Sequence, residues 1–146
     1  MKILIFGLPG SGKTTLAKPF ADLIGAVHIN ADAVRTQYEG PDMTKWDFSL
    51  EGRMQQAQRM RHLADGVVMA GKIAVADFVC PTEEARTQFA PNYTVWMDTI
   101  KQGRFEDTNK MFQAPTEFDY HVAEWFTDTH QQLSEVVMNY MEKKNV

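Results

Sequence analysis

One glycine-rich stretch near the N-terminus constrains this chain more than any other feature. It runs Gly7-Leu8-Pro9-Gly10-Ser11-Gly12-Lys13-Thr14 and has the G-x-x-x-x-G-K-T spacing of a phosphate-binding P-loop. Glycines allow positive φ angles, so consecutive backbone N–H groups can face one anion, and the next helix adds its positive N-terminal end. In this motif Lys13 reaches the β- and γ-phosphates, and the Thr14 hydroxyl ligates Mg²⁺.

The residues around this loop provide the context that the motif requires. Residues 2–6 form a short apolar run, which predicts a buried strand. Apolar residues then recur at helical spacing, at Leu16, Phe20, Leu23 and Ile24. We therefore predict that Gly7 to Thr15 bind ATP, with Mg²⁺ as the cofactor.

Length and composition narrow the class of protein further. A chain of 146 residues is the size of one domain, so we expect a single domain over residues 1–146. Cys80 is the only cysteine, which excludes an internal disulfide and fits a reducing cytoplasm. The net charge of −4 argues against a broad nucleic-acid surface, and no apolar stretch is long enough to span a membrane. We expect a cytoplasmic protein, and the sequence leaves homodimer formation open.

The rest of the chain alternates between strand and helix patterns. Further strands are expected at residues 26–29, 73–77, 93–98 and 120–125. Helices are expected at 50–69, from Thr82 to before Pro91, and around 133–141, with a polar loop at 36–48. This alternation predicts an α/β fold, a P-loop kinase-type three-layer sandwich with a mainly parallel five-stranded sheet.

Polar residues follow two of these strands. Asp32 and Arg35 come after the second strand, and Asp77 ends the third. The carboxyl ends of parallel strands are where ligands bind, so these side chains are site candidates. Asp77 resembles a Walker B acid, which holds Mg²⁺ through water. The alternatives are that Asp32 caps a short helix, Arg35 is solvated and Asp77 is a chance match.

Two later segments add candidates. Arg53 and Gln56 lie one helical turn apart, off the apolar stripe, and could face the same cleft. Residues 99–116 are polar and charged, with Arg104 and Lys110 among the cations. A phosphotransferase needs a mobile cover that excludes water, and this segment is the best candidate for that lid. The alternative is a plain exposed helix.

Taken together, these motifs resemble the adenylylsulfate kinase (APS kinase) family. That family carries a P-loop, then D-G-D-N-V-R, then F-S-x-x-x-R-x-x-N, then I-S-P before an arginine. The corresponding residues here are Gly7–Thr14, Asn30–Arg35, Phe48-Ser49 with Arg53 and Gln56, and Val79-Cys80-Pro81 with Arg86. Order and spacing agree over roughly the first hundred residues.

The resemblance implies roles for these residues. Asp32 matches the catalytic acid/base at the acceptor hydroxyl, beside the catalytic Lys13. Arg35 and Arg53 match residues that grip the phosphosulfate, and Phe48 matches one that stacks on its adenine. Val79, Cys80 and Pro81, with Gln56, match other parts of the acceptor site. The implied substrates are ATP and adenosine 5′-phosphosulfate.

Several positions depart from the family pattern. Asn30 replaces the first aspartate, Gln56 replaces an asparagine, and Asp77 stands where the family has a small or apolar residue. The lid is shortened, and Arg104 to Pro115 contains no glycine, whereas the family has a lysine-glycine-rich stretch and a second phenylalanine there.

We expect a kinase that transfers the γ-phosphoryl of ATP to the 3′-hydroxyl of APS. One alternative is a P-loop kinase for another hydroxyl acceptor, such as a nucleic-acid 5′-hydroxyl or a hydroxymethylated base. The other is a nucleotide-binding switch without turnover. A GTPase switch would need N-K-x-D, whereas Asn109-Lys110 is followed by Met111-Phe112.

Overall fold

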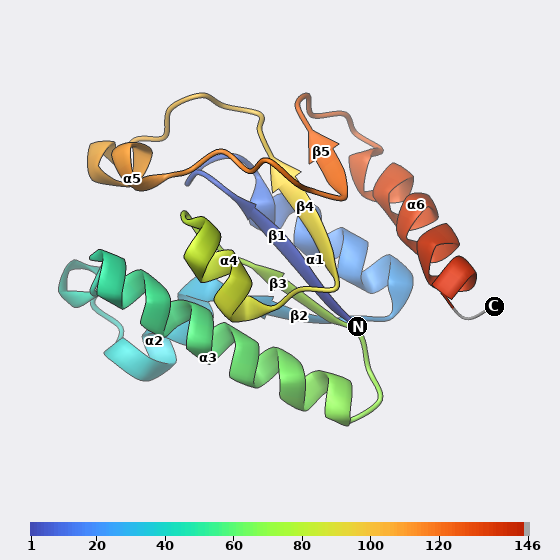
Figure 1. The fold of residues 1–146 in the computed structure, drawn as a ribbon, viewed down its shortest axis with the longest axis horizontal. Coiled ribbons are helices and arrows are strands. Elements are labelled where there is room, and N and C mark those ends of the chain that lie inside the picture. Colours follow the sequence, from blue (N-terminus) through green and yellow to red (C-terminus); the bar gives the residue numbers. More distant parts are fainter. Residues whose placement is uncertain (145–146) are drawn as a thin grey trace.

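The computed structural model describes residues 1–144 as a central sheet flanked by helices (Figure 1). The strands are β1 (Lys2–Gly7), β2 (Val27–Asn30), β3 (Ala74–Asp77), β4 (Tyr93–Met97) and β5 (Tyr120–Val122). The helices are α1 (Lys13–Ile24), α2 (Ala31–Glu39), α3 (Leu50–Met69), α4 (Glu83–Phe89), α5 (Glu106–Met111) and α6 (Thr129–Lys144), with a 3₁₀ turn, η1, at Met43–Lys45.

All the strands of the sheet run parallel, in the order β2-β3-β1-β4-β5. Asp77 at the end of β3 pairs with Ile5 on one side and Asn30 on the other. The carboxyl ends of the strands therefore meet at one edge of the sheet. The expected parallel five-stranded sheet is confirmed.

Helices cover both faces of the sheet, giving three layers (Figure 1). Leu16 and Phe20 of α1 and Leu133 and Val137 of α6 pack on one face, against alternate residues of the strands. Residues of α2, α3 and α4 pack on the other, among them Val34, Ala57, Met60, Ala64, Ala85 and Phe89. The expected three-layer sandwich is confirmed. Among the residues described, none of the helices is both long and apolar enough to cross a membrane.

Two expected boundaries were wrong. Residues 36–39, predicted as the start of a loop, belong to α2, because the helix buries Val34 and Arg35 and ends only at Gly40, whose φ is +90°. Such a positive φ favours glycine and stops a helix. The fifth strand ends at Val122, not Trp125, because its β4 partner Met97 is the last residue of that strand.

Candidate active site

A cavity of about 690 Å³ lies at the carboxyl ends of β1 and β3. The connections that follow these adjacent strands leave in opposite directions, to β2 and to β4, which is where α/β sheets bind ligands. Most of the residues singled out by sequence line it: Pro9, Gly10, Gly12, Lys13, Thr14, Thr15, Asp32, Arg35, Phe48, Arg53, Gln56, Asp77, Val79, Cys80, Pro81 and Arg104. The volume is in the range of small-molecule sites.

Four predicted residues do not line the cavity. Leu8 and Ser11 are buried in the P-loop, and Gly7 ends β1 against Met97, whose carbonyl oxygen would lie 2.5 Å from a Cβ at position 7. Gly7 therefore supports the loop by allowing close strand packing. Lys110 is not among the lining residues, and its Nζ lies 3.5 Å from the exposed Glu106 carboxylate.

The P-loop leads directly into α1. Gly12 has a φ of +94° and is the residue before the helix, so the N-terminal N–H groups of α1 follow the loop. Lys13 Nζ donates to the Leu8 carbonyl at 3.0 Å. Burial lowers the pKa of Lys13 to about 8, although the negative charges of Asp77 and Asp32 act to raise it. Lys13 thus lies near two acids in a partly desolvated site.

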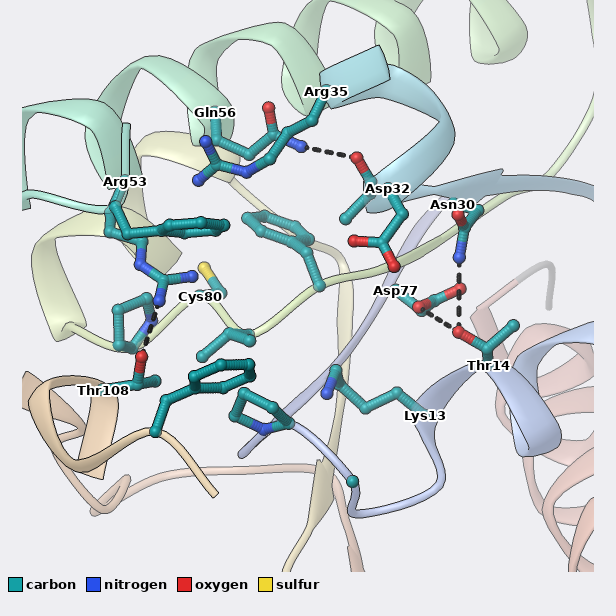
Figure 2. A pocket seen from close by; sticks show the side chains of 18 of the residues that line it. Lys13, Thr14, Asn30, Asp32, Arg35, Arg53, Gln56, Asp77, Cys80 and Thr108 are labelled. Atoms are coloured by element: carbon teal, nitrogen blue, oxygen red, sulfur yellow. Dashed lines mark hydrogen bonds between the residues drawn. The ribbon is translucent and has the colours of Figure 1, made fainter. Parts of the chain in front are cut away.

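Oxygen donors suited to Mg²⁺ gather beside Lys13. Thr14 Oγ1 donates to Asp77 Oδ1 at 3.0 Å and accepts from Asn30 Nδ2 at 3.2 Å (Figure 2). The described residues contain no cluster of three His, Cys, Asp or Glu side chains able to form a complete metal cage. Mg²⁺ in nucleotide sites needs only one or two protein oxygens, since water and phosphates supply the rest. One hydroxyl and one carboxylate therefore fit a nucleotide-bound Mg²⁺.

Asp32 lies in the first turn of α2, and Asn30 caps that helix instead. The Asn30 side chain accepts a hydrogen bond from the Ala33 N–H at 3.0 Å, which is the usual N-cap contact. The alternative reading of Asp32 as a helix cap was therefore wrong. The Asp32 carboxylate points into the cavity on the side of Asp77 and Lys13 (Figure 2). It remains available to a bound molecule.

Two buried arginines form the cationic end of the cavity. Arg35 and Arg53 are 3% and 8% exposed, and their guanidinium carbons lie 4.6 Å and 4.9 Å from the ring centre of Phe48. Burial, together with the charge of Arg35, lowers the pKa of Arg53 to about 10, so it stays charged at neutral pH. Within residues 1–144, Arg35 Nη2 and Arg53 Nε are buried without a hydrogen-bond partner. Unpaired buried donors of this kind suit an anion with several oxygens.

Other side chains hold these arginines in place. Glu39 accepts from Arg35 and from Arg59, each at 2.8 Å, and its other oxygen accepts the Asp47 N–H at 2.8 Å. Burial acts to raise the pKa of Glu39, but these donors lower it overall, so the carboxylate stays ionised. Arg53 Nη2 donates to Thr108 Oγ1 of α5 at 2.8 Å, which joins segment 99–116 to α3 (Figure 2).

Gln56 is buried behind the arginines. Its Nε2 donates to the Ala31 carbonyl at 3.0 Å, and its Oε1 accepts from Arg59 at 3.2 Å. With both ends of the amide engaged, Gln56 fixes the start of α2 against α3. Gln56 also lines the cavity.

The loop after β3 forms the opposite wall. Cys80 has a φ of +44° and is 2% exposed, and burial raises the pKa of its thiol far above the usual range. The guanidinium of Arg86 donates to the carbonyls of Cys80 at 3.0 Å, Pro81 at 3.2 Å and Gln113 at 2.6 Å. Arg86 is therefore a structural residue that fixes this wall and the end of segment 99–116. At the start of segment 99–116, Thr99 Oγ1 donates to the Ser11 carbonyl at 2.7 Å.

Segment 99–116 brings residues to the cavity that the sequence alone did not identify. Phe105, Asp107 and Thr108 line it together with Arg104. Phe105 is 47% exposed and lies just before the short helix α5. The signal available in the sequence was an aromatic residue next to the candidate lid cation Arg104.

Comparison with known proteins gives the family and the fold of this chain. Residues 3–95 match the family model described as an AAA domain. A probable adenylyl-sulfate kinase of Aeropyrum pernix is 29% identical over 85 residues, covering 58% of this chain and 46% of that protein. A shikimate kinase of Actinobacillus pleuropneumoniae is 24% identical over 116 residues, covering 77% of this chain and 66% of that protein. The chain thus aligns with about half to two thirds of these curated relatives.

Among solved structures, the APS kinase of Mycobacterium tuberculosis in complex with AMPPNP and APS superposes with a TM-score of 0.74. The match covers 97% of this chain and 96% of that chain, at 15% sequence identity. At this identity the likeness concerns the fold, which is that of P-loop kinases.

Proposed function

The chain belongs to the AAA domain family, and from this premise we propose that it is a kinase that transfers the γ-phosphoryl group of ATP to the 3′-hydroxyl of APS. The observation that carries the proposal is the pair of buried arginines, Arg35 and Arg53, each with an unpaired nitrogen and both against the ring of Phe48. A molecule with an aromatic base and a compact anionic group matches this combination. The phosphosulfate and adenine of APS have those two features.

ATP binds in the P-loop from Gly7 to Thr15 in this proposal. Lys13 neutralises the β- and γ-phosphates, and Thr14 with Asp77, the latter through water, holds Mg²⁺, which offsets the charge of the phosphates. Arg104 covers the transferring group from segment 99–116, where it lines the cavity. We give Lys110 no part in the reaction, since it is not among the residues that line the cavity.

The acceptor occupies the arginine end of the cavity. Arg35 and Arg53 bind the phosphosulfate, and Val79, Cys80 and Pro81 form the wall beside it. The adenine stacks on Phe48, and Phe105 supplies the second aromatic face. Both rings line the cavity and are partly exposed, at 42% and 47%.

Asp32 orients the acceptor hydroxyl. As the bond between the γ-phosphorus and its bridging oxygen breaks, the 3′-oxygen bonds to that phosphorus and its proton passes to the Asp32 carboxylate. ADP leaves with the electron pair of the broken bond. Asn30 caps α2 and contacts Thr14, so it supports the site without adding a second acid. We place this reaction in the cytoplasm, where the lone Cys80 stays reduced.

A direct assay tests the proposal. The protein is incubated with ATP and Mg²⁺ and, separately, APS, shikimate and a 5′-hydroxyl oligonucleotide, and phosphorylated products are identified by mass. We expect phosphorylated APS alone, and no product from the 3′-deoxy analogue of APS or with Lys13→Ala. Phosphorylated shikimate would favour a small carboxylate acceptor, which buried arginines also suit, and the 24%-identical shikimate kinase motivates that arm. ATP binding without any product would favour a switch.

A further inference from the structure

A histidine outside the cavity lining contacts the candidate metal-site acid. His28 lies on β2, and its Nε2 bonds to Asp77 Oδ2, while Asp77 Oδ1 accepts from Thr14 Oγ1 at 3.0 Å. The Asp77 side chain is 3% exposed and that of His28 is 19% exposed. Each oxygen of this buried carboxylate therefore has its own partner, and the partners lie on opposite sides of it.

The sheet register produces this contact. Asn30 pairs with Asp77 across β2 and β3, and His28 lies two residues earlier on the same strand. Side chains two apart on a strand share a face, so His28 and Asn30 both lie on the α1 side of the sheet, opposite to Ile29, which packs toward α3. Asn30 donates to Thr14 from this face. The two β2 side chains thus contact the two members of the Thr14–Asp77 pair.

A buried carboxylate needs hydrogen bonds in a fixed geometry. Leaving such a group unpaired in the protein interior is costly, and the carboxylate would rotate toward any other donor. One such donor near Asp77 is Lys13, whose pKa the Asp77 charge acts to raise. Without His28, the Oδ2 atom would be free to turn Asp77 away from Thr14.

We propose that His28 is a positioning residue, which holds the Asp77 carboxylate so that Oδ1 faces Thr14 and the Mg²⁺ of the bound nucleotide. The inference rests on the metal-binding half of the proposed function and is independent of the acceptor. Groups that hydrogen-bond to metal-binding carboxylates typically contribute 10- to 100-fold to metal affinity. His28 therefore acts through Asp77 and touches neither substrate nor metal.

Metal binding to the protein–AMPPNP complex tests this role without turnover. Mn²⁺ affinity is measured by electron paramagnetic resonance, and AMPPNP affinity in EDTA is measured by calorimetry. We expect His28→Leu to weaken Mn²⁺ binding about 10- to 100-fold and to leave metal-free AMPPNP binding unchanged. His28→Gln, whose amide can donate to Asp77, should recover most of the affinity. His62→Leu, exposed on α3, is the matched control and should match the wild type.

A double-mutant cycle with Asp77→Asn separates positioning from packing. If His28 acts through Asp77, His28→Leu causes no further loss of Mn²⁺ affinity in the Asp77→Asn background. A wild-type Mn²⁺ affinity in His28→Leu, an equal loss in His28→Gln, or an additive loss in the double variant would each overturn the proposal. If thermal melting shows that His28→Leu is not folded, His28→Val is used in its place, because valine favours strands.

The same series distinguishes this inference from the proposed function. If Asp77→Asn leaves Mn²⁺ binding unchanged, Asp77 does not bind the metal, and the proposed role of His28 is overturned as well. The product assay with APS remains decisive for the reaction itself. If Asp77→Asn weakens Mn²⁺ binding and His28→Leu does not, only the His28 inference is overturned.

Discussion

Replacing Phe48 by alanine should separate acceptor binding from ATP binding. The ring of Phe48 is 42% exposed and lines the cavity, and the guanidinium carbons of Arg35 and Arg53 lie 4.6 Å and 4.9 Å from its centre. Loss of a base–aromatic stack costs about 1–3 kcal/mol. At about 1.4 kcal/mol per tenfold, the KM for APS should rise about 5- to 150-fold.

The arginines should stay in place in this variant. Each cation–π contact of these buried arginines contributes about 2 kcal/mol, whereas Arg35 also has a charged hydrogen bond to Glu39 and a further bond to the Asp47 carbonyl, and Arg53 has one to Thr108. Hydrogen bonds to charged groups contribute about 1.5–3 kcal/mol. The loss of base stacking therefore dominates, and the anion end of the site remains intact.

The assay is steady-state kinetics with each substrate varied in turn, together with calorimetric binding of APS. Phe118→Ala is the matched control, because Phe118 is 41% exposed, packs on Trp96 with ring centres 5.5 Å apart and is absent from the cavity lining. We expect the KM for ATP to be unchanged in both variants. An equal rise for ATP and APS, or no change for APS in Phe48→Ala, would refute the assignment of Phe48 to the adenine.

Three further predictions concern the P-loop side of the cavity. Lys13→Ala should nearly abolish phosphotransfer while the circular dichroism spectrum and melting temperature stay close to wild type, because Lys13 stabilises charge in the transferring group; near wild-type turnover would contradict this. Asp32→Asn should lower kcat about 10²- to 10⁴-fold with ATP affinity nearly intact, and a full kcat would show that Asp32 is not the acid/base. Because burial lowers the pKa of Lys13 to about 8, AMPPNP affinity in EDTA should be constant below that pH and fall as pH rises above it, since the neutral amine must first take up a proton to pair with phosphate. Lys13→Arg, which stays protonated, should abolish that alkaline loss in calorimetry; an equal loss in both proteins would assign it to another group.

The parallel sheet explains why much of the site could be predicted. Asp32, Asp77 and the P-loop lie far apart in sequence, yet each follows a strand of the same sheet, so each reaches the same edge. Arg53 was grouped with them because it lies one helical turn from Gln56, and both are buried on α3 and line the cavity. Periodicity and strand ends together were enough to find these residues.

The residues that were missed depend on contacts that no local pattern carries. Glu39 was assigned to a loop, and its role appears only because α2 packs beside Arg59 of α3. Thr108 and Phe105 lie in a segment without apolar periodicity. Their position at the cavity follows from the Arg53–Thr108 hydrogen bond and from the anchors of the segment at Thr99 and Gln113. In the sequence His28 has no feature that distinguishes it from other strand residues. Its contact with Asp77 depends on the β2–β3 register.

The anchoring of segment 99–116 limits where this chain can vary in length. Its first residue is tied to the P-loop through Thr99 and Ser11, and Gln113 is tied to Pro81 and Arg86, with the Gln113 N–H donating to the Pro81 carbonyl at 2.7 Å. Within segment 99–116, an insertion or deletion at either anchor, outside residues 100–112, would shift one of these ties and with it the P-loop or the cavity wall at Pro81. We therefore expect gain or loss of residues in this segment to fall between the two anchors, in the stretch that lines the cavity. Relatives can diverge in substrate by changing the length of this stretch while both binding loops keep their positions.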